Sequence, residues 1–353
     1  MLPYWLLFVL FAAGSFEYRR RAHIGEQAAP ILVAGGILIA LVVGLRYEVG
    51  GDWYNYLEIY EQIALLDLAT ALVTQDPGYA LLNYVANDLE LEIWFVNLIC
   101  GLIFSWGLIK FARRQPNPWL AVLIAIPYLV IVVAMGYTRQ AVAIGLLLAG
   151  LASLDRSTMI RFGLYIVLAT AFHKSAIVVL PLVGLAAARE RIVVAGLVAV
   201  LGALLYYFFV EASIDRLVTN YVEAQYAAQG AAIRVAMNVP PALLFLFYRR
   251  RFNLNSQQQR LWTNFSVAAV VALFMLLLTE ATTALDRLAL YLIPLQIFVL
   301  SRIPEAFHNN GRANVQIMFL IVIYSALIQF VWLNYAVHAE YWLPYQIYPL
   351  LEE

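Results

Sequence analysis

The stretch RYEVGGDWYNY, Arg46 to Tyr56, follows an unbroken apolar run from Ala28 to Leu45. Apolar runs of about 17–25 residues cross a lipid bilayer as a helix. The chain therefore leaves an apolar medium at Arg46. It then places a charge, a Gly-Gly turn, an aspartate and several aromatic rings at the boundary. This arrangement predicts a membrane helix that ends directly before a polar, functional turn.

The rest of the chain has the same apolar character. Of its 353 residues, 64% are hydrophobic and only 12% are charged. A soluble domain carries about 25% charged residues, and it could not bury this much apolar surface in one core. The composition predicts an all-α polytopic membrane protein with one integral-membrane domain, residues 1–353. We expect a bundle of about 11–12 transmembrane helices.

Several functional classes are excluded at this stage. The net charge is zero, which gives no basic surface for nucleic acid. Cys100 is the only cysteine, so neither an internal disulfide nor a cysteine-based zinc site is expected. No nucleotide-binding glycine loop and no metal-ligand spacing is present, and we expect no cofactor and no metal. The first apolar run precedes its arginines, which predicts a retained helix and not a cleavable signal.

Basic residues of membrane proteins concentrate on cytoplasmic loops. The three basic clusters therefore define the cytoplasmic side: Arg19 to Arg21, Lys110 to Arg114, and Arg249 to Arg251. The predicted helices then cover about residues 2–16, 28–45, 93–110, 118–136, 138–154, 192–210, 235–248, 262–279, 288–301 and 314–333. External loops at 46–92 and 211–233 would cap a cavity that faces outside. The short apolar piece at 63–73 is expected to lie at the interface.

The segment 162–188 does not fit this alternation, because it is too short for two full crossings. His173 and Lys174 lie in its middle. A broken pair of half-helices would bring both ends to the cytoplasmic side and carry these polar residues to the break. Irregular backbone at membrane depth needs protein or a wet cavity around it. The alternative is one full helix.

Six of the 22 Lys and Arg residues lie away from the cytoplasmic loops on this map: Arg46, Arg139, Lys174, Arg216, Arg234 and Arg287. Basic residues placed against the positive-inside bias often serve function. The guanidinium fork suits phosphate oxygens, so these residues predict an anionic ligand such as a lipid diphosphate. The alternative is local ion pairing of Arg46 with Glu48, Arg216 with Asp215 and Arg287 with Asp286.

Two residues are candidate general bases. Asp52 directly follows the Gly50-Gly51 turn, where it could orient or deprotonate a hydroxyl group. His173 is the second candidate. A lone histidine in an apolar run is more often a packed residue, but Lys174 and Ser175 beside it favour function.

Five short motifs occur in order along the chain. They are R-x3-G-G-D-x3-Y at 46–56, D-P-G-Y-A-L-L-N-Y at 76–84, T-R-Q-A-V-A-I at 138–144, F-H-K-S-A at 172–176 and D-R-L-A-L-Y at 286–291. Their succession resembles the EpsG family of Wzy-type polysaccharide polymerases over about residues 40–295. The C-terminal third matches only a loose aromatic-Pro ending at Trp342, Pro344 and Tyr345.

The resemblance implies a glycosyltransferase in the bacterial inner membrane, and direct displacement, the simplest mechanism, would make it an inverting one. It would join oligosaccharide units carried on undecaprenyl diphosphate at the outer face, for an exopolysaccharide or O-antigen, and a flippase and a chain-length regulator would be its partners. Asp52 and His173 would be catalytic. Substrate contacts would come from Arg46, Arg139, Gln140, Lys174, Arg287, Tyr56, Tyr291 and Arg234. The alternatives are a ligase-type transferase of lipid-linked glycan and a transporter of lipid or solute.

Overall fold

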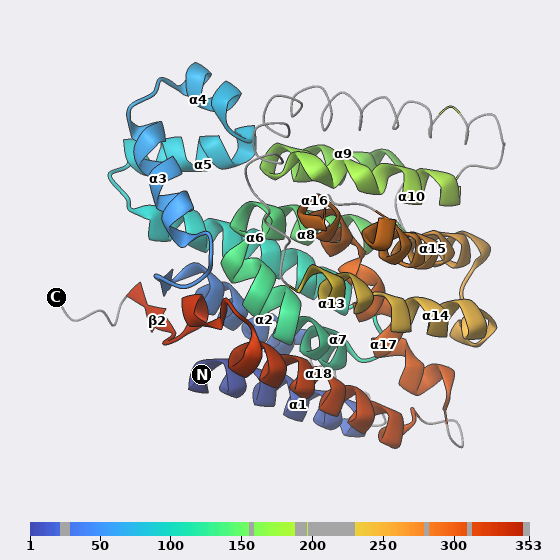
Figure 1. Ribbon diagram of the computed structural model, residues 1–353. Coiled ribbons are helices and arrows are strands. Elements are labelled where there is room, and N and C mark those ends of the chain that lie inside the picture. The colour runs from blue at the N-terminus through green and yellow to red at the C-terminus, as the bar shows by residue number, and fades with distance from the viewer. Residues whose placement is uncertain are drawn as a thin grey trace. The chain divides into compact units, whose positions relative to one another are not determined.

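The computed structural model describes residues 1–21, 29–154, 159–187, 196, 230–278, 282–308 and 313–348 (Figure 1). These residues are almost entirely helical. Their sheet consists of two short strands, β1 (Arg46–Tyr47) and β2 (Gln346–Ile347). Contacts within the chain divide it into two units, Met1–Ala176 with Leu300–Glu353, and Ile177–Val299. The two units are described separately.

The first unit contains α1 (Leu2–Arg21), α2 (Ala29–Gly44), α3 (Trp53–Ala64), α4 (Leu68–Thr74), α5 (Pro77–Asp88), α6 (Ile93–Ala112), α7 (Pro118–Ala125), the π-helix η1 (Ile126–Ala134), α8 (Thr138–Leu151), α9 (Met159–Phe172), α18 (Val315–Tyr335) and the 3₁₀ helix η6 (Ala339–Trp342). Its core is α8, which packs against α6 and α9, while α6 also packs against α2. Glycine allows the closest of these contacts. A Cβ atom on Gly107 of α6 would lie 1.9 Å from the carbonyl oxygen of Gly145 on α8. Small residues permit such close backbone approach between membrane helices.

The second unit contains α10 (Val179–Ala187), α13 (Ala231–Ala236), α14 (Val239–Tyr248), the 3₁₀ helix η4 (Arg249–Phe252), α15 (Ser256–Leu278), α16 (Thr282–Ala289), the 3₁₀ helix η5 (Leu290–Leu292) and the first part of α17 (Ile293–Ala306). The rings of Trp262 on α15 and Phe298 on α17 stack with centroids 3.9 Å apart. The Asn264 side chain donates to the Leu182 carbonyl oxygen at 2.9 Å and ties α15 to α10.

The prediction of an all-α polytopic membrane protein is confirmed. Five helices of the described residues are long and apolar enough to cross a membrane: Ile93–Ala112, Ala231–Phe252, Ser256–Leu276, Thr282–Ala306 and Val315–Tyr335. Shorter apolar helices add to these within both units. The predicted helix at 192–210 and most of the predicted loop at 211–233 lie outside the described residues, and the expected number of crossings stays a prediction.

The predicted break inside 162–188 is confirmed. The helix α9 ends at Phe172, and the 3₁₀ helix η2 (Lys174–Val178) follows before α10 begins. His173 lies at the point of interruption and belongs to neither helix. The polar residues are therefore carried on non-α-helical backbone.

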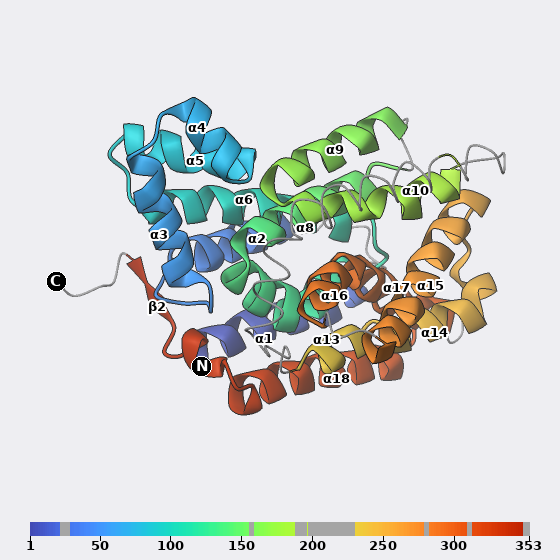
Figure 2. The same ribbon diagram turned by 45° about the horizontal axis from the view of Figure 1, so that its top comes forward.

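The structure differs from the predicted boundaries in three places. The segment 46–92 is not a loop, because α3, α4 and α5 occupy most of it and pack on one another (Figures 1 and 2). Asp67 caps α4 by accepting from the Thr70 backbone at 3.0 Å, and Pro77 begins α5. The first helix continues to Arg21, since arginine is a good helix former. The helix expected at 288–301 lies within the apolar helical span Thr282–Ala306, in which the 3₁₀ turn η5 joins α16 to α17.

Arg46 is fully buried, with 0% of its surface exposed. Its guanidinium donates to the carbonyl oxygens of Val43 and Val49, to Asn97 Oδ1 at 3.2 Å and to Thr138 Oγ1 at 2.7 Å. These acceptors belong to the end of α2, the following turn, α6 and the start of α8. A single side chain thus joins four segments of the chain.

The turn after Arg46, residues 46–52, requires the glycine expected there. Gly50 has a φ of +108°, and a Cβ atom at this position would lie 2.2 Å from the carbonyl oxygen of Met135. Only glycine combines this backbone conformation with such close approach. The backbone N–H of Gly50 donates to the Tyr341 carbonyl oxygen at 2.8 Å.

The C-terminal segment closes over the same turn. The strands β1 and β2 are antiparallel, with Arg46 opposite Ile347. The indole N–H of Trp342 donates to the Ile131 carbonyl oxygen at 2.7 Å, and the Tyr4 hydroxyl donates to the Trp342 carbonyl oxygen at 2.8 Å. The loose aromatic-Pro ending of the sequence is therefore part of the core of the first unit.

We expect Arg46→Lys to destabilise the protein, because an ammonium group keeps the charge but cannot reach all four acceptors. A buried polar group left without its partner costs about 1–3 kcal/mol. The thermal unfolding midpoint in detergent measures the loss. Arg113→Lys is the matched control, since Arg113 is exposed and such changes cost at most about 0.5 kcal/mol. Equal midpoints for the two variants would contradict the role of Arg46.

Candidate functional site

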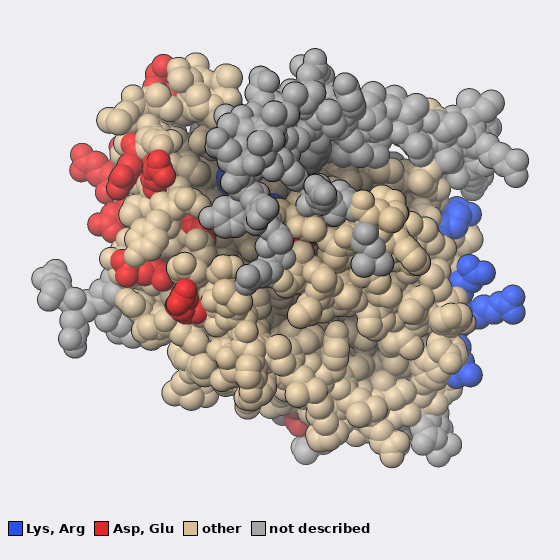
Figure 3. Space-filling model, in the orientation of Figure 1, with Lys and Arg blue, Asp and Glu red and all other residues tan. Residues whose placement is uncertain are grey.

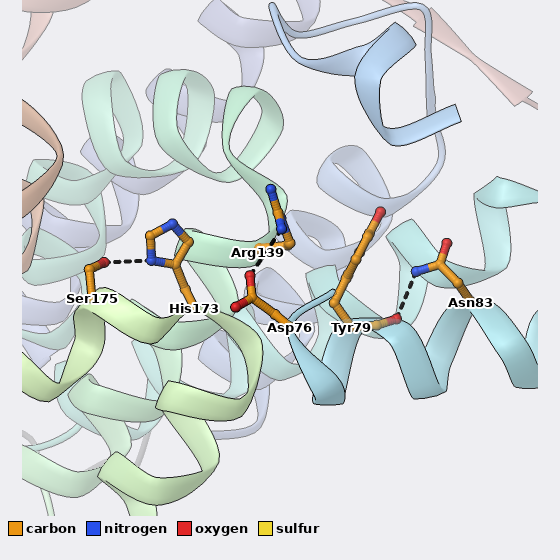
Figure 4. A network of polar contacts seen from close by, with 6 residues as sticks. All are labelled: Asp76, Tyr79, Asn83, Arg139, His173 and Ser175. Atoms are coloured by element: carbon orange, nitrogen blue, oxygen red, sulfur yellow. Dashed lines mark hydrogen bonds and ion pairs between the residues drawn. The ribbon is translucent and has the colours of Figure 1, made fainter. Parts of the chain in front are cut away.

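An ion pair joins α8 to the start of α5 in the first unit. Arg139 NH1 lies 3.0 Å from Asp76 Oδ2, and the two side chains are 26% and 10% exposed (Figure 4). Asp76 directly precedes Pro77, the first residue of α5, and Arg139 is in the first turn of α8. The Asp76 carboxylate is thus nearly buried, whereas about a quarter of the Arg139 side chain remains exposed.

Two tyrosine rings enclose the guanidinium. Its carbon lies 5.9 Å from the ring centroid of Tyr56 on α3 and 5.8 Å from that of Tyr79 on α5. Both rings are buried, and this geometry gives a cation–π attraction at each. Arg139 Nε is also buried and has no hydrogen-bond partner among the described residues. The arginine is thus held in place while one of its donors remains unused.

The broken helix reaches the same ion pair. In Figure 4, His173 and Ser175 lie on one side of Asp76 and Arg139, and Tyr79 lies on the other. The Ser175 hydroxyl forms a hydrogen bond with His173 Nδ1. Burial raises the pKa of Asp76 above its usual value, although the charges of Arg139 and Lys174 and the backbone N–H of Lys174 lower it. Lys174 is therefore close enough to act on the carboxylate.

Asp52 belongs to this neighbourhood through Tyr56. Burial raises the pKa of the Tyr56 phenol, the nearby charge of Asp52 raises it further, and Arg139 opposes both effects. We use the name Arg139 cluster for Asp52, Tyr56, Asp76, Tyr79, Arg139, His173 and Lys174. Of these, the sequence predicted Asp52, Tyr56, Arg139, His173 and Lys174 as site residues.

Arg46 is connected to the Arg139 cluster through Thr138. Its hydrogen bond to Thr138 fixes the residue directly before Arg139. The expected pairing of Arg46 with Glu48 is wrong, because Glu48 is exposed whereas Arg46 bonds carbonyl oxygens, an amide and a hydroxyl inside the protein. Gln140 is likewise buried, with 1% of its surface exposed. Arg46 thus supports the start of α8 through Thr138, and Gln140 lies buried in its first turn.

Three further predicted residues belong to the second unit. The guanidinium of Arg234 on α13 donates hydrogen bonds to both carboxylate oxygens of Asp286 on α16, at 2.6–3.0 Å. The sequence analysis gave an ion pair between Asp286 and its neighbour Arg287 as the alternative. Arg287 is half-buried on α16. Tyr291 is buried in η5. Their convergence with Arg139 stays a prediction, and Arg216 lies outside the described residues.

Asp76 and Tyr79 are the residues that sequence reasoning missed. Both lie in the D-P-G-Y segment that contributed to the family resemblance, but a search for misplaced positive charge does not select them. Asp76 and Arg139 are 63 positions apart in the sequence, so no rule based on local spacing predicts their pairing. Among the described residues, no group of three or more His, Cys, Asp and Glu side chains is arranged to hold a metal ion.

Comparison with known proteins gives one positive finding. Neither the curated proteins nor the solved structures contain a significant match. The model of the EpsG family matches residues 31–347 of the 353, a range that includes the Arg46 turn, the Arg139 cluster and the closing C-terminal segment. The match covers nearly the whole chain and confirms the resemblance found in the motifs: the protein belongs to the EpsG family.

Proposed function

We propose that the protein is a polysaccharide polymerase that joins repeat units carried on undecaprenyl diphosphate. The observation that carries this proposal is the Arg139 cluster: a partly exposed arginine between two tyrosine rings, paired with Asp76 and next to His173 and Lys174. Membership of the EpsG family supports the same reaction.

The cluster suits a diphosphate leaving group. When the glycosidic bond to the lipid carrier breaks, negative charge develops on the diphosphate, and fixed cations stabilise that charge most. Arg139 offers a planar set of donors for phosphate oxygens, and the exposed Lys174 adds a second positive charge. The ion pair with Asp76 fixes the orientation of the Arg139 guanidinium. In this role Asp76 positions the arginine and does not touch the substrate.

The acceptor hydroxyl must lose a proton as its oxygen attacks the anomeric carbon. Asp52, whose charge acts on Tyr56, and His173, which lies beside the Arg139–Asp76 pair, are the two candidate bases. When Nδ1 of His173 carries the proton and donates it to Ser175, Nε2 is the acceptor that a base requires. The new carbon–oxygen bond replaces the bond to the diphosphate, so direct displacement inverts the anomeric centre.

The surroundings support an extracytoplasmic active face in the bacterial inner membrane. Segment 46–92 contains a single basic residue, the buried Arg46, as the positive-inside bias requires of an external segment. Acidic side chains gather over α3–α5 in Figure 3. Arg234, Arg287 and Tyr291 would contact glycan or diphosphate, and Arg46 and Gln140 would position α8. A flippase that delivers the lipid-linked units and a chain-length regulator would act with the enzyme.

Arg139→Lys should lower polymerisation by about 10²–10³-fold, the usual effect of removing one donor from a site of developing charge. The charge is kept, but the planar fork is lost. The assay follows glycan elongation and released lipid diphosphate from a synthetic lipid-linked repeat unit. Arg113→Lys is the control and should keep normal activity. An unimpaired Arg139→Lys enzyme would remove this residue from the site.

The same assay separates the alternatives. A polymerase elongates the glycan when lipid-linked units are the only substrate, whereas a ligase needs a different acceptor. Movement of the lipid-linked unit across sealed vesicles without bond formation would instead show a transporter. A requirement for a different acceptor, or transport without bond formation, would overturn the proposal.

The base is identified by one pair of variants. Removal of a general base typically costs about 10²–10⁴ in rate. If Asp52 is the base, Asp52→Asn shows this loss and His173→Gln a milder one; if His173 is the base, the order reverses. A histidine base also makes the wild-type rate fall as the pH is lowered, because a protonated imidazole cannot accept the proton of the acceptor hydroxyl. Normal rates for both variants between about pH 5 and 8 would exclude both bases.

Asp76→Asn tests the positioning role. An ordinary aspartate has a pKa of about 3.9. Burial raises the pKa of Asp76 above that value, so its carboxylate takes up a proton at a higher pH. The ion pair with Arg139, and with it activity, should therefore weaken as the pH falls toward the acid end. Asp76→Asn should lower kcat at every pH and abolish this dependence. A variant with the wild-type acid profile would show that Asp76 does not control Arg139.

A further inference from the structure

A groove of about 790 Å³ lies between α2 and α6, away from the Arg139 cluster. Val33 and Ile37 of α2 and Leu102 of α6 form much of its wall, and they are 41%, 52% and 41% exposed. The Ser105 hydroxyl donates to the Gly36 carbonyl oxygen, so these two groups of the lining satisfy each other. The groove is thus an apolar surface open to the surroundings of the helices.

One end of the groove is strongly positive. Lys110, Arg113 and Arg114 line it, and among the described residues no carboxylate does. Lys110 Nζ donates to the Tyr165 hydroxyl at 2.6 Å and lies 4.9 Å from the ring centroid of Trp106. Neither Arg113 nor Arg114 forms an ion pair with a carboxylate of the described residues.

The positive end lies far from the candidate site along α6. Asn97 near the start of this helix bonds Arg46, and Lys110 follows 13 residues later, a rise of about 20 Å at 1.5 Å per residue. Because α6 is long and apolar enough to cross the membrane, its two ends meet opposite interfaces. Trp106 and Tyr165 have the amphipathic rings that favour this level.

We propose that the groove binds an anionic phospholipid of the leaflet opposite the Arg139 cluster. The phosphate group lies against Lys110, Arg113 and Arg114, and an acyl chain lies along Val33, Ile37 and Leu102. Charge complementarity selects an anionic over a zwitterionic headgroup, since three cations and no carboxylate line the groove in the described part of the chain. The open apolar wall selects a lipid over a soluble phosphate. The proposal is independent of the glycosyl transfer reaction.

The test measures retained phosphatidylglycerol by native mass spectrometry of the purified full chain in neutral detergent. The first variant combines Lys110→Gln, Arg113→Gln and Arg114→Gln. Each cation near an anionic lipid contributes about fivefold in affinity, so the triple variant should bind about a hundredfold more weakly. The control combines Arg249→Gln, Arg250→Gln and Arg251→Gln, which removes the same charge from exposed positions outside the groove. It should bind like the wild type, and phosphatidylcholine should bind weakly to all.

A second variant, Ile37→Trp, fills the groove and leaves all three cations. It should also lose the phospholipid, and it decides the question if the triple variant fails to fold in a thermal unfolding assay. Equal loss in the Arg249–Arg251 control would show diffuse attraction, and unchanged binding in Ile37→Trp would show that no chain occupies the groove. Displacement by soluble glycerol phosphate, or preference for a polyprenyl phosphate, would also overturn the proposal.

Discussion

A guanidinium without exposed surface is stable only where acceptors meet its donors, because an unpaired buried charge is very costly. Arg46 meets this condition with acceptors from four segments: the end of α2, the turn at 46–52, Asn97 of α6 and Thr138 of α8. These segments cannot move independently without breaking a buried hydrogen bond. The residue after Thr138 is Arg139, so the placement of the candidate site depends on a side chain that the substrate need not touch.

The Arg139 cluster combines rigidity with access. Asp76, Tyr56 and Tyr79 hold the guanidinium from three directions, which fixes its orientation before any ligand arrives. Such preorganisation is what makes electrostatic stabilisation effective, because no reorganisation is needed as charge develops. Burial raises the pKa of Asp76, whereas the charges of Arg139 and Lys174 lower it. A ligand that binds these two cations would therefore change the pKa of the carboxyl group. The break at His173 supplies non-helical backbone at the same place.

The sequence predicted the features that depend on length, composition and charge sign. The apolar runs located both ends of α6 and α18 within about two residues and the end of α15 within one, although α15 begins six residues earlier than predicted. The inconsistency in the charge pattern located the break at His173. It did not predict α3–α5, because short amphipathic helices carry no membrane-length signal. The partners of Arg46 were missed since two are backbone carbonyl oxygens and two are neutral side chains, which charge pairing does not identify. The pairs Arg139–Asp76 and Arg234–Asp286 join residues 63 and 52 positions apart.

The closure of the Arg46 turn by the C-terminal segment has a consequence for biosynthesis. Tyr341, Trp342 and Ile347 emerge from the ribosome about 300 residues after the turn that they cover, which takes about 15–60 s at ordinary translation rates. During that interval α2, α6 and α8 already exist while β1 has no partner strand. The Arg46 turn is therefore covered late, and a chain whose synthesis stops before β2 enters the membrane without the strand and the indole that close over this turn.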